Sequence, residues 1–389
     1  MKQRTVIINI CLFGFFLRLI YVFYSGKALQ YPDEERFWSE AMSLLERGLF
    51  QSNWKRANDM PLTGMVIATV MRLTGCGVMG VKVFFAVVSS ITIYFISRLA
   101  YSILPNKKAA VLAAAIAAIY PFFIYYSSLV LSETLFLLLV TLVFLSTLAS
   151  DEKNGWKTGL LLGVTHLTRP TFIYFLPFIW GWMLFVKKVP LRSVILSMLC
   201  FCILVVPWGV RNYKVLGRFN LSTSSSGQVL WEGNNPWNTT GGVSGSFPNP
   251  KTYLKSVPRE KGEFEQDDWK KEQAVTFIKD NPGQFVVLSW KRFIRFWHLW
   301  PNNESLSSWK YKVVSLGSFG VVLLLFLLSP VLLWRQRNKL ALIYLFTAYY
   351  TAIHMITIGS IRYRLPLEPL LIAIAGGTLT MIFCKTTKD

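Results

Sequence analysis

The chain has 389 residues and a formal net charge of +21; 53% of its residues are hydrophobic and only 16% are charged. Soluble domains carry about 25% charged residues, so this chain has too few polar groups to cover a water-facing surface. A lipid bilayer is therefore the expected solvent, and disorder, a collagen-like fibre and a disulfide scaffold are excluded. The five cysteines form no Cys-x-x-Cys pair, which is typical of small buried hydrophobic residues rather than metal ligands.

Ten apolar segments predict about ten transmembrane helices. They cover 6–23, 81–104, 109–128, 132–149, 158–168, 171–186, 194–210, 313–334, 340–358 and 365–384. The first follows two basic residues, as in a signal peptide, but it is too long and lacks a small-x-small cleavage site, so we expect a membrane anchor. Arg169-Pro170 separates two short segments and predicts a tight turn at membrane depth.

Basic residues fall in every second loop, for example at Lys107-Lys108, Lys187-Lys188 and Arg335. The positive-inside rule then places both termini inside and both long loops, 25–80 and 211–312, outside. This pattern explains much of the net charge without a nucleic-acid partner. We expect a bacterial inner (plasma) membrane protein whose site faces the periplasm or outside.

Three parts follow from this layout. Residues 1–210 form an N-terminal transmembrane bundle whose first outer loop carries candidate acids, 211–312 form a mixed outer loop domain, and 313–389 form C-terminal transmembrane helices.

Helices are also predicted within the outer loops. Pro32 and the acids after it favour a helix start, and Gly48 is a plausible end, so an amphipathic helix is expected over 32–49. Residues 61–73 are apolar but too short to span a membrane. The Gly/Ser/Thr/Asn-rich stretch 222–247 predicts irregular backbone, and Asn281-Pro282 should break the following region into two helices. Trp290, Trp297 and Trp300 suggest an aromatic belt at the membrane interface.

Several short motifs, in order along the chain, resemble the membrane-embedded GT-C glycosyltransferases. The narrower resemblance is to the dolichyl-phosphate-mannose protein mannosyltransferases and the lipid A aminoarabinose transferase. The matching segments are Asp33-Glu34, Arg36, Pro61-Leu62 (with Met60 where a basic residue is usual), Ser132-Glu133-Thr134, Thr168-Arg169-Pro170, Pro207-Trp208, Arg211-Asn212-Tyr213, Gly233-Asn234-Asn235 and Arg362-Tyr363-Arg364-Leu365-Pro366. The resemblance implies an all-α polytopic membrane protein of GT-C type. It also implies an inverting transferase that takes a sugar from a polyprenyl-phosphate donor at the outer membrane face.

Such a transfer needs a carboxylate to accept the hydroxyl proton and cations to stabilise the departing phosphate. Asp33, the first acid after the first span, is the candidate general base, and Glu34 and Glu133 are further catalytic candidates. Arg36, Arg169, Arg211, Arg362 and Arg364 are the candidate phosphate-binding residues. Arg169 needs a partner at membrane depth, which is either Glu133 or the donor phosphate.

The sequence leaves open whether a metal ion is bound, which acceptor is used and which of several related functions applies. Asp33 and Glu133 could share a divalent cation, whereas His166, His298 and His354 show no metal spacing and His166 suits core packing. The partners implied are the lipid-linked donor, membrane lipids, and a glycan, lipid or protein acceptor. The alternatives are a lipid-linked oligosaccharide polymerase or ligase, and a flippase or transporter of lipid-linked sugar.

Overall fold

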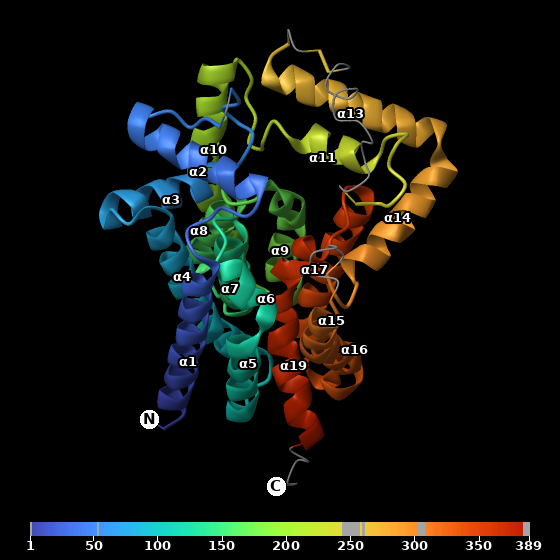
Figure 1. The fold of residues 1–389 in the computed structure, drawn as a ribbon. Coiled ribbons are helices and arrows are strands. Elements are labelled where there is room, and N and C mark those ends of the chain that lie inside the picture. The colour runs from blue at the N-terminus through green and yellow to red at the C-terminus, as the bar shows by residue number, and fades with distance from the viewer. Residues whose placement is uncertain (1, 53, 243–256, 259–260, 302–307, 384–389) are drawn as a thin grey trace.

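The computed structural model describes residues 2–52, 54–242, 257–258, 261–301 and 308–383. Within these ranges the chain is helical, and its only β pairing is an isolated bridge between Ser52 and Lys55. The described part of 211–312, predicted as a mixed outer loop domain, contains helices and irregular segments and no strand (Figure 1).

Within the described residues, each of the ten predicted apolar segments is mainly helical. The bundle consists of α1 (Lys2–Ser25), α4 (Gly77–Ile103), α5 (Lys107–Ile119), α6 (Pro121–Ser127), α7 (Glu133–Leu148), α8 (Gly155–His166), η1 (Pro170–Phe175), α9 (Leu176–Gly181), η2 (Trp182–Val186), α10 (Leu191–Leu216), α15 (Trp309–Ser315), η4 (Leu316–Gly320), α16 (Val321–Leu332), η5 (Trp334–Gln336), α17 (Arg337–Ile356), α18 (Ile361–Arg364), η6 (Leu365–Leu367) and α19 (Glu368–Phe383).

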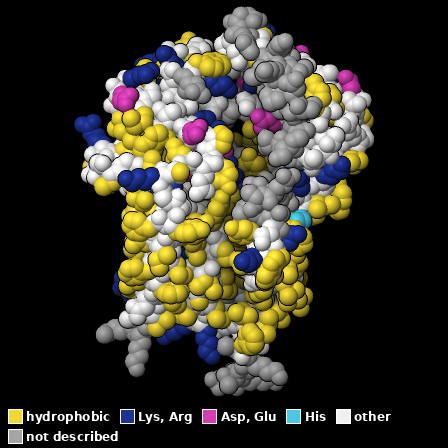
Figure 2. Space-filling model, in the orientation of Figure 1, with side chains coloured by type: hydrophobic (Ala, Val, Ile, Leu, Met, Phe, Trp, Pro, Cys, Tyr) yellow, Lys and Arg dark blue, Asp and Glu magenta, His cyan; other side chains and the backbone are white. Residues whose placement is uncertain are grey.

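Six helical stretches of the described chain are long and apolar enough to cross a membrane. They are Gln3–Ser25, Gly77–Ile103, Leu191–Leu216, Trp309–Leu332, Trp334–Ile356 and Ile361–Phe383, and the bent pair α5–α6 would be a seventh. A band of apolar side chains surrounds the bundle in Figure 2. These features are those of an integral membrane protein, while the count of about ten crossings stays a prediction.

The loop helices gather at one end of the bundle, here called the loop end. Figure 1 shows α2 (Pro32–Arg47), α3 (Pro61–Thr74), α11 (Ser226–Gly233) and α13 (Glu263–Asp280) at this end, whereas α1 starts and α19 finishes at the opposite end. Both long loops therefore lie on the same side of the bundle, and the compartment that this side faces stays a prediction.

Local signals set most of the loop helices. Pro32 begins α2, and Gly48 ends it with a φ of 65°, a left-handed conformation that suits glycine. Pro282 separates α13 from α14 (Pro282–Phe296) as expected.

The prediction of irregular backbone over 222–247 is wrong in part, because α11 forms within it; residues 243–247 lie outside the described ranges. The Asp267 carboxylate accepts the backbone N–H groups of Gly227 (2.8 Å) and Gln228 (2.9 Å) and so caps this helix from a distant segment.

A buried arginine holds the break between α5 and α6. Arg18 of α1 is fully buried, although no carboxylate contacts it in the described chain. It donates to Ser89 Oγ (2.7 Å) and to the carbonyls of Gly14 (2.8 Å), Ala118 (3.0 Å) and Ala117 (3.1 Å). Pro121 has no N–H, so it cannot bond the Ala117 carbonyl four residues earlier. Arg18 therefore satisfies backbone groups that the proline and the bend leave free.

We expect Arg18→Met to destabilise the protein by roughly 2–5 kcal/mol, because each carbonyl left without a donor in an apolar core costs about 1–3 kcal/mol. Ser89→Ala removes one partner and should cost about 1 kcal/mol. Reversible denaturation in mixed micelles measures both, and equal effects of the two substitutions would contradict the assignment.

Candidate functional site

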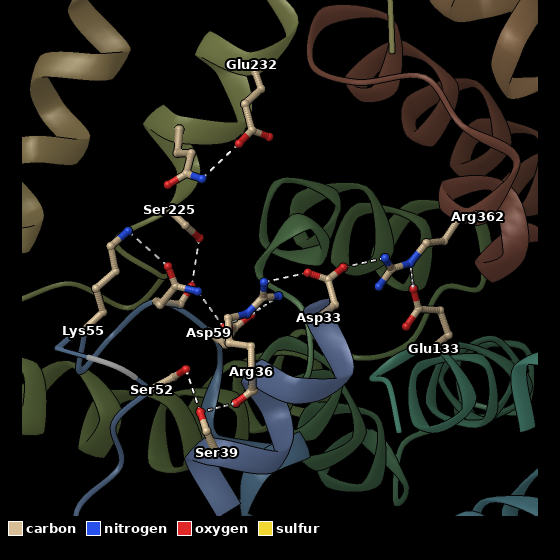
Figure 3. Close-up of polar contacts among 12 residues, drawn as sticks. Asp33, Arg36, Ser39, Ser52, Lys55, Asp59, Glu133, Ser225, Glu232 and Arg362 are labelled. Atoms are coloured by element: carbon tan, nitrogen blue, oxygen red, sulfur yellow. Dashed lines mark hydrogen bonds and ion pairs between the residues drawn. The ribbon is translucent and has the colours of Figure 1, made fainter. Parts of the chain in front are cut away.

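The Asp33 carboxylate accepts hydrogen bonds from two arginines, which come from opposite ends of the chain. Its Oδ1 receives Arg36 Nη1 at 2.6 Å, and its Oδ2 receives Arg362 Nη1 at 2.5 Å. Figure 3 shows the carboxylate between these two guanidinium groups. The second contact joins α2 to α18, 329 residues further along the chain.

The ion pairs continue on both sides of Asp33. Arg362 also donates through Nε to Glu133, whose Oε1 lies 2.8 Å from Arg169 Nη2. On the other side, Arg36 donates to both oxygens of Asp59, at 2.6 and 3.2 Å. Three carboxylates thus alternate with three guanidinium groups, and their formal charges cancel. Pairing of this kind offsets the cost of removing the charges from water.

The ion-paired residues lie at or near the ends of helices, and these helix ends meet at the loop end of the bundle. Asp33 lies in the first turn of α2, Glu133 is the first residue of α7, and Arg362 lies in the short helix α18. The Ser360 hydroxyl accepts the Arg362 backbone N–H at 3.3 Å and caps that helix. Arg169 lies three residues after the end of α8, and Pro170 then starts η1, which agrees with the predicted tight turn.

The two arginines keep Asp33 ionised. Burial opposes its negative charge, but the charges of Arg362 and Arg36, together with their hydrogen bonds, hold the pKa of the carboxyl below its usual value. Asp33 is therefore a carboxylate at neutral pH. It is also a weak proton acceptor for as long as both guanidinium groups stay bonded to it.

A cavity of about 400 Å³ opens beside the ion pairs. Its wall combines charged groups, hydroxyl groups and rings. It includes Asp33, Arg36, Phe37, Asn58, Asp59, Met60, Ser132, Thr168, Arg169, Pro170, Thr171, Tyr174, Ser222, Thr223, Ser225, Ser226, Val229, Leu230, Lys271, Tyr350, Ile353, His354, Thr357, Ile358, Arg362 and Tyr363. Side chains from α2, from both loops and from α17 and α18 thus face one space.

The cavity collects four of the eight predicted site residues: Asp33, Arg36, Arg169 and Arg362 all line it. Glu133 does not line it but is fully buried against two of them. Of the two partners expected for Arg169, the structure thus shows Glu133. This arrangement gives Glu133 the position of a residue that holds the cavity arginines in place.

Glu34 points away from the cavity. Its Oε1 accepts the backbone N–H groups of Gln30 (2.8 Å) and Tyr31 (3.2 Å), and its Oε2 accepts that of Val130 (2.8 Å). The side chain is fully buried. Glu34 therefore joins the start of α2 to the segment before α7.

Two predicted phosphate ligands also lie elsewhere. Arg211 donates to the carbonyls of Arg56 (2.7 Å) and Phe50 (3.0 Å) and so holds the first loop. Arg364 is fully buried and paired with Glu368 at 3.0 Å. Neither lines the cavity that contains Asp33.

The cavity also contains residues that sequence reasoning did not single out. Asp59 completes the ion pairs, and its one local signal is its place just before a helix that starts at Pro61. His354 stacks on Tyr363 with centroids 4.9 Å apart. Lys271 also lines the cavity and has no ion pair within the described residues. The predicted core role of His166 agrees with its burial and with its contact to the Leu221 carbonyl at 2.8 Å.

The described residues do not suit a divalent cation shared by Asp33 and Glu133. The Arg362 guanidinium bonds to both carboxylates and so occupies the position between them. No group of three or more His, Cys, Asp or Glu residues in the described chain could hold a metal ion. Hard cations need several oxygen ligands, and both oxygens of Asp33 and Oε1 of Glu133 already accept arginine.

Comparison with protein families gives one match. The family described as dolichyl-phosphate-mannose-protein mannosyltransferase matches residues 58–210. This range includes Glu133 and Arg169 but begins after Asp33. No curated protein sequence matches the chain.

Solved structures match nearly the whole chain. The archaeal oligosaccharyltransferase AglB from Archaeoglobus fulgidus, in complex with an inhibitory peptide and a dolichol-phosphate, is 11% identical with a TM-score of 0.62. The match covers 99% of this chain and 51% of AglB, so the chain spans about half the length of that protein. ArnT from Cupriavidus metallidurans bound to undecaprenyl phosphate is 13% identical, with a TM-score of 0.46 and coverage of 98% and 78%.

The family match over 58–210 and the fold shared with AglB agree with the motifs found along the sequence. The resemblance of this chain to the membrane-embedded GT-C glycosyltransferases is therefore confirmed, and the chain shares the fold of AglB over nearly its whole length.

Proposed function

We propose that the chain is an integral membrane glycosyltransferase that moves a sugar from a polyprenyl-phosphate donor to an acceptor hydroxyl with inversion. The observation that carries this proposal is the position of Asp33. It is an ionised carboxylate held between two cations, at the wall of a cavity and at the end of an apolar bundle. The fold shared with AglB, whose structure contains a dolichol-phosphate, supports a lipid-linked donor.

The reaction requires one proton transfer and one displacement. The acceptor hydroxyl oxygen attacks the anomeric carbon, a new C–O bond forms, and the bond to the phosphate oxygen breaks. The electron pair leaves with the polyprenyl phosphate, and the hydroxyl proton passes to Asp33. Attack from the side opposite the phosphate inverts the anomeric centre.

Arg362 and Arg169 are the proposed ligands of the donor phosphate. Both line the cavity, and both are anchored by Glu133. A phosphate that accepts hydrogen bonds from Arg362 would compete with Asp33 for the same guanidinium group. Donor binding would then free one oxygen of Asp33 and raise its proton affinity, so the base would become active only when the donor is present. Arg36 would keep the carboxylate in place from the other side.

The remaining predicted residues have supporting roles in this proposal. Glu133 positions the two arginines, and Glu34 and Arg211 hold the loops that form the cavity wall. Arg364 stabilises the start of α19 through Glu368. We place the site on the periplasmic or outer face of a bacterial inner membrane, from the basic residues in alternate loops. The loop domain that we propose over 211–312 overlaps the end of α10 and the start of α15.

Asp33→Asn should lower turnover roughly 10²-fold or more, because the amide keeps the shape but cannot accept the proton. Binding of the polyprenyl-phosphate sugar should stay within a few-fold of wild type. Glu35→Gln is the matched control, since Glu35 is exposed in the same turn of α2 and makes the same change of charge.

A steady-state assay with purified protein and a synthetic donor measures this effect. Near-normal turnover of Asp33→Asn would rule out Asp33 as the base. Loss of turnover in Glu34→Gln with a folded protein and an active Asp33→Asn would assign the base to the neighbouring carboxylate.

Arg169→Ala should weaken donor binding by about 2–4 kcal/mol, the scale of losing charge-assisted bonds to phosphate, and Arg169→Lys should keep part of it. Arg72→Ala, at an exposed position of α3, controls for the loss of one positive charge. Titration with a polyprenyl phosphate in nanodiscs measures the affinities. Unchanged binding by a folded Arg169→Ala protein would make this arginine structural.

Turnover should be unaffected by EDTA, because no group of three or more His, Cys, Asp or Glu residues in the described chain could hold a metal ion. A structure of the A. fulgidus oligosaccharyltransferase contains Zn and sulfate. Measuring turnover with and without EDTA therefore tests whether this chain needs a metal ion. Loss of activity in EDTA that added Mg²⁺ or Mn²⁺ restores would contradict this expectation.

A further inference from the structure

Helix α14 has three distinct faces. Leu288, Arg292 and Phe296 are buried against the protein. Gln284, Lys291 and Arg295 form a polar edge. The third face is apolar and uncovered: the exposed fractions are 65% for Val286, 52% for Val287, 59% for Trp290 and 48% for Ile294. At about 100° per residue, these four side chains lie within one arc of about 100°.

Helix α14 packs against α17, which belongs to one of the stretches long and apolar enough to cross a membrane. Figure 1 shows α14 running from α13 toward α15, on the outside of the molecule beside α17. α15 begins the apolar stretch Trp309–Leu332 and exposes Trp309 and Val313. Of the three tryptophans predicted to form a belt, Trp297 is partly buried and packs on Phe319 (centroids 6.5 Å apart) at the edge of the core; the belt itself stays a prediction. Trp290 and Trp309 are the more exposed tryptophans of this region.

The charges beside this face are basic. Lys291 and Arg295 lie along the edge of α14, and Lys310 and Lys312 lie in the first turn of α15. An apolar stripe that contains tryptophan and is bordered by lysine and arginine is typical of helices at the boundary between lipid headgroups and acyl chains. The basic border suits anionic headgroups, and the packing of α14 against a candidate membrane span favours lipid over a protein partner.

We infer that α14 lies in the membrane interface at the loop end, with Val286, Val287, Trp290 and Ile294 inserted among the lipids. Its opposite face then connects the lipid surface to the cavity wall. Arg292 bonds to the carbonyls of Met355 (2.9 Å) and Ile356 (3.1 Å) in α17, and to Gly233 and Asn234 at the end of α11. Val229 and Leu230 of α11 line the cavity, so α14 would fix the height of this wall above the bilayer. This inference about α14 does not depend on which reaction the cavity supports.

Single fluorescent labels on the full-length protein test this placement. Val287→Cys carries the label on the apolar face, and Gln284→Cys carries it on the exposed polar edge of the same helix, both in a background without the five native cysteines. The protein is reconstituted into vesicles of phosphatidylethanolamine and phosphatidylglycerol. Lipids with a doxyl group near the headgroup quench from the membrane, and iodide quenches from water.

The doxyl lipid should quench the label at 287 several-fold more than the label at 284, and iodide should show the reverse order. Equal access of iodide to both positions would overturn the inference and place this face in water. Protection of position 287 from both quenchers would also overturn it, because a second copy or another protein would then cover the helix.

Discussion

The bridge made by Arg362 is the interaction on which the site depends. One guanidinium group binds Asp33 from the first loop and Glu133 from the start of α7, so it joins three parts of the chain that are far apart in sequence. The fully buried Glu133 could not be placed at the end of an apolar bundle without a cation, because an unpaired buried charge costs several kcal/mol. Folding of the C-terminal helices is therefore what completes the cavity wall.

The neutral set of ion pairs around Asp33 links its proton affinity to donor binding. Three arginines and three carboxylates neutralise one another in the absence of ligand. The phosphodiester of a polyprenyl-phosphate sugar carries one negative charge; once bound, it would upset this balance and would draw guanidinium groups from the carboxylates. The same contacts that stabilise the free protein would then make the proton affinity of Asp33 depend on the donor, and this would limit activation of the acceptor to occupied sites.

The sequence predicts those elements whose signals are local. Pro32 and Gly48 delimit α2, and Pro282 separates α13 from α14. Helix α11 was missed because its cap, Asp267, lies 40 residues downstream. Asp33 and Glu34 are adjacent and chemically similar, and only tertiary packing shows that one faces the cavity while the other binds backbone N–H groups. The same limit applies to Asp59, whose role follows from its contact with Arg36.

A structure of the protein in a lipid nanodisc with a non-transferable polyprenyl-phosphate sugar analogue would test the central claim most directly. The proposal predicts the phosphate within hydrogen-bond distance of Arg362 and Arg169, the anomeric carbon facing the acceptor space beside Asp33, and the contact between Arg362 and Asp33 lengthened or lost. A phosphate bound away from both arginines, with the Arg362 bridge between Asp33 and Glu133 unchanged, would contradict it.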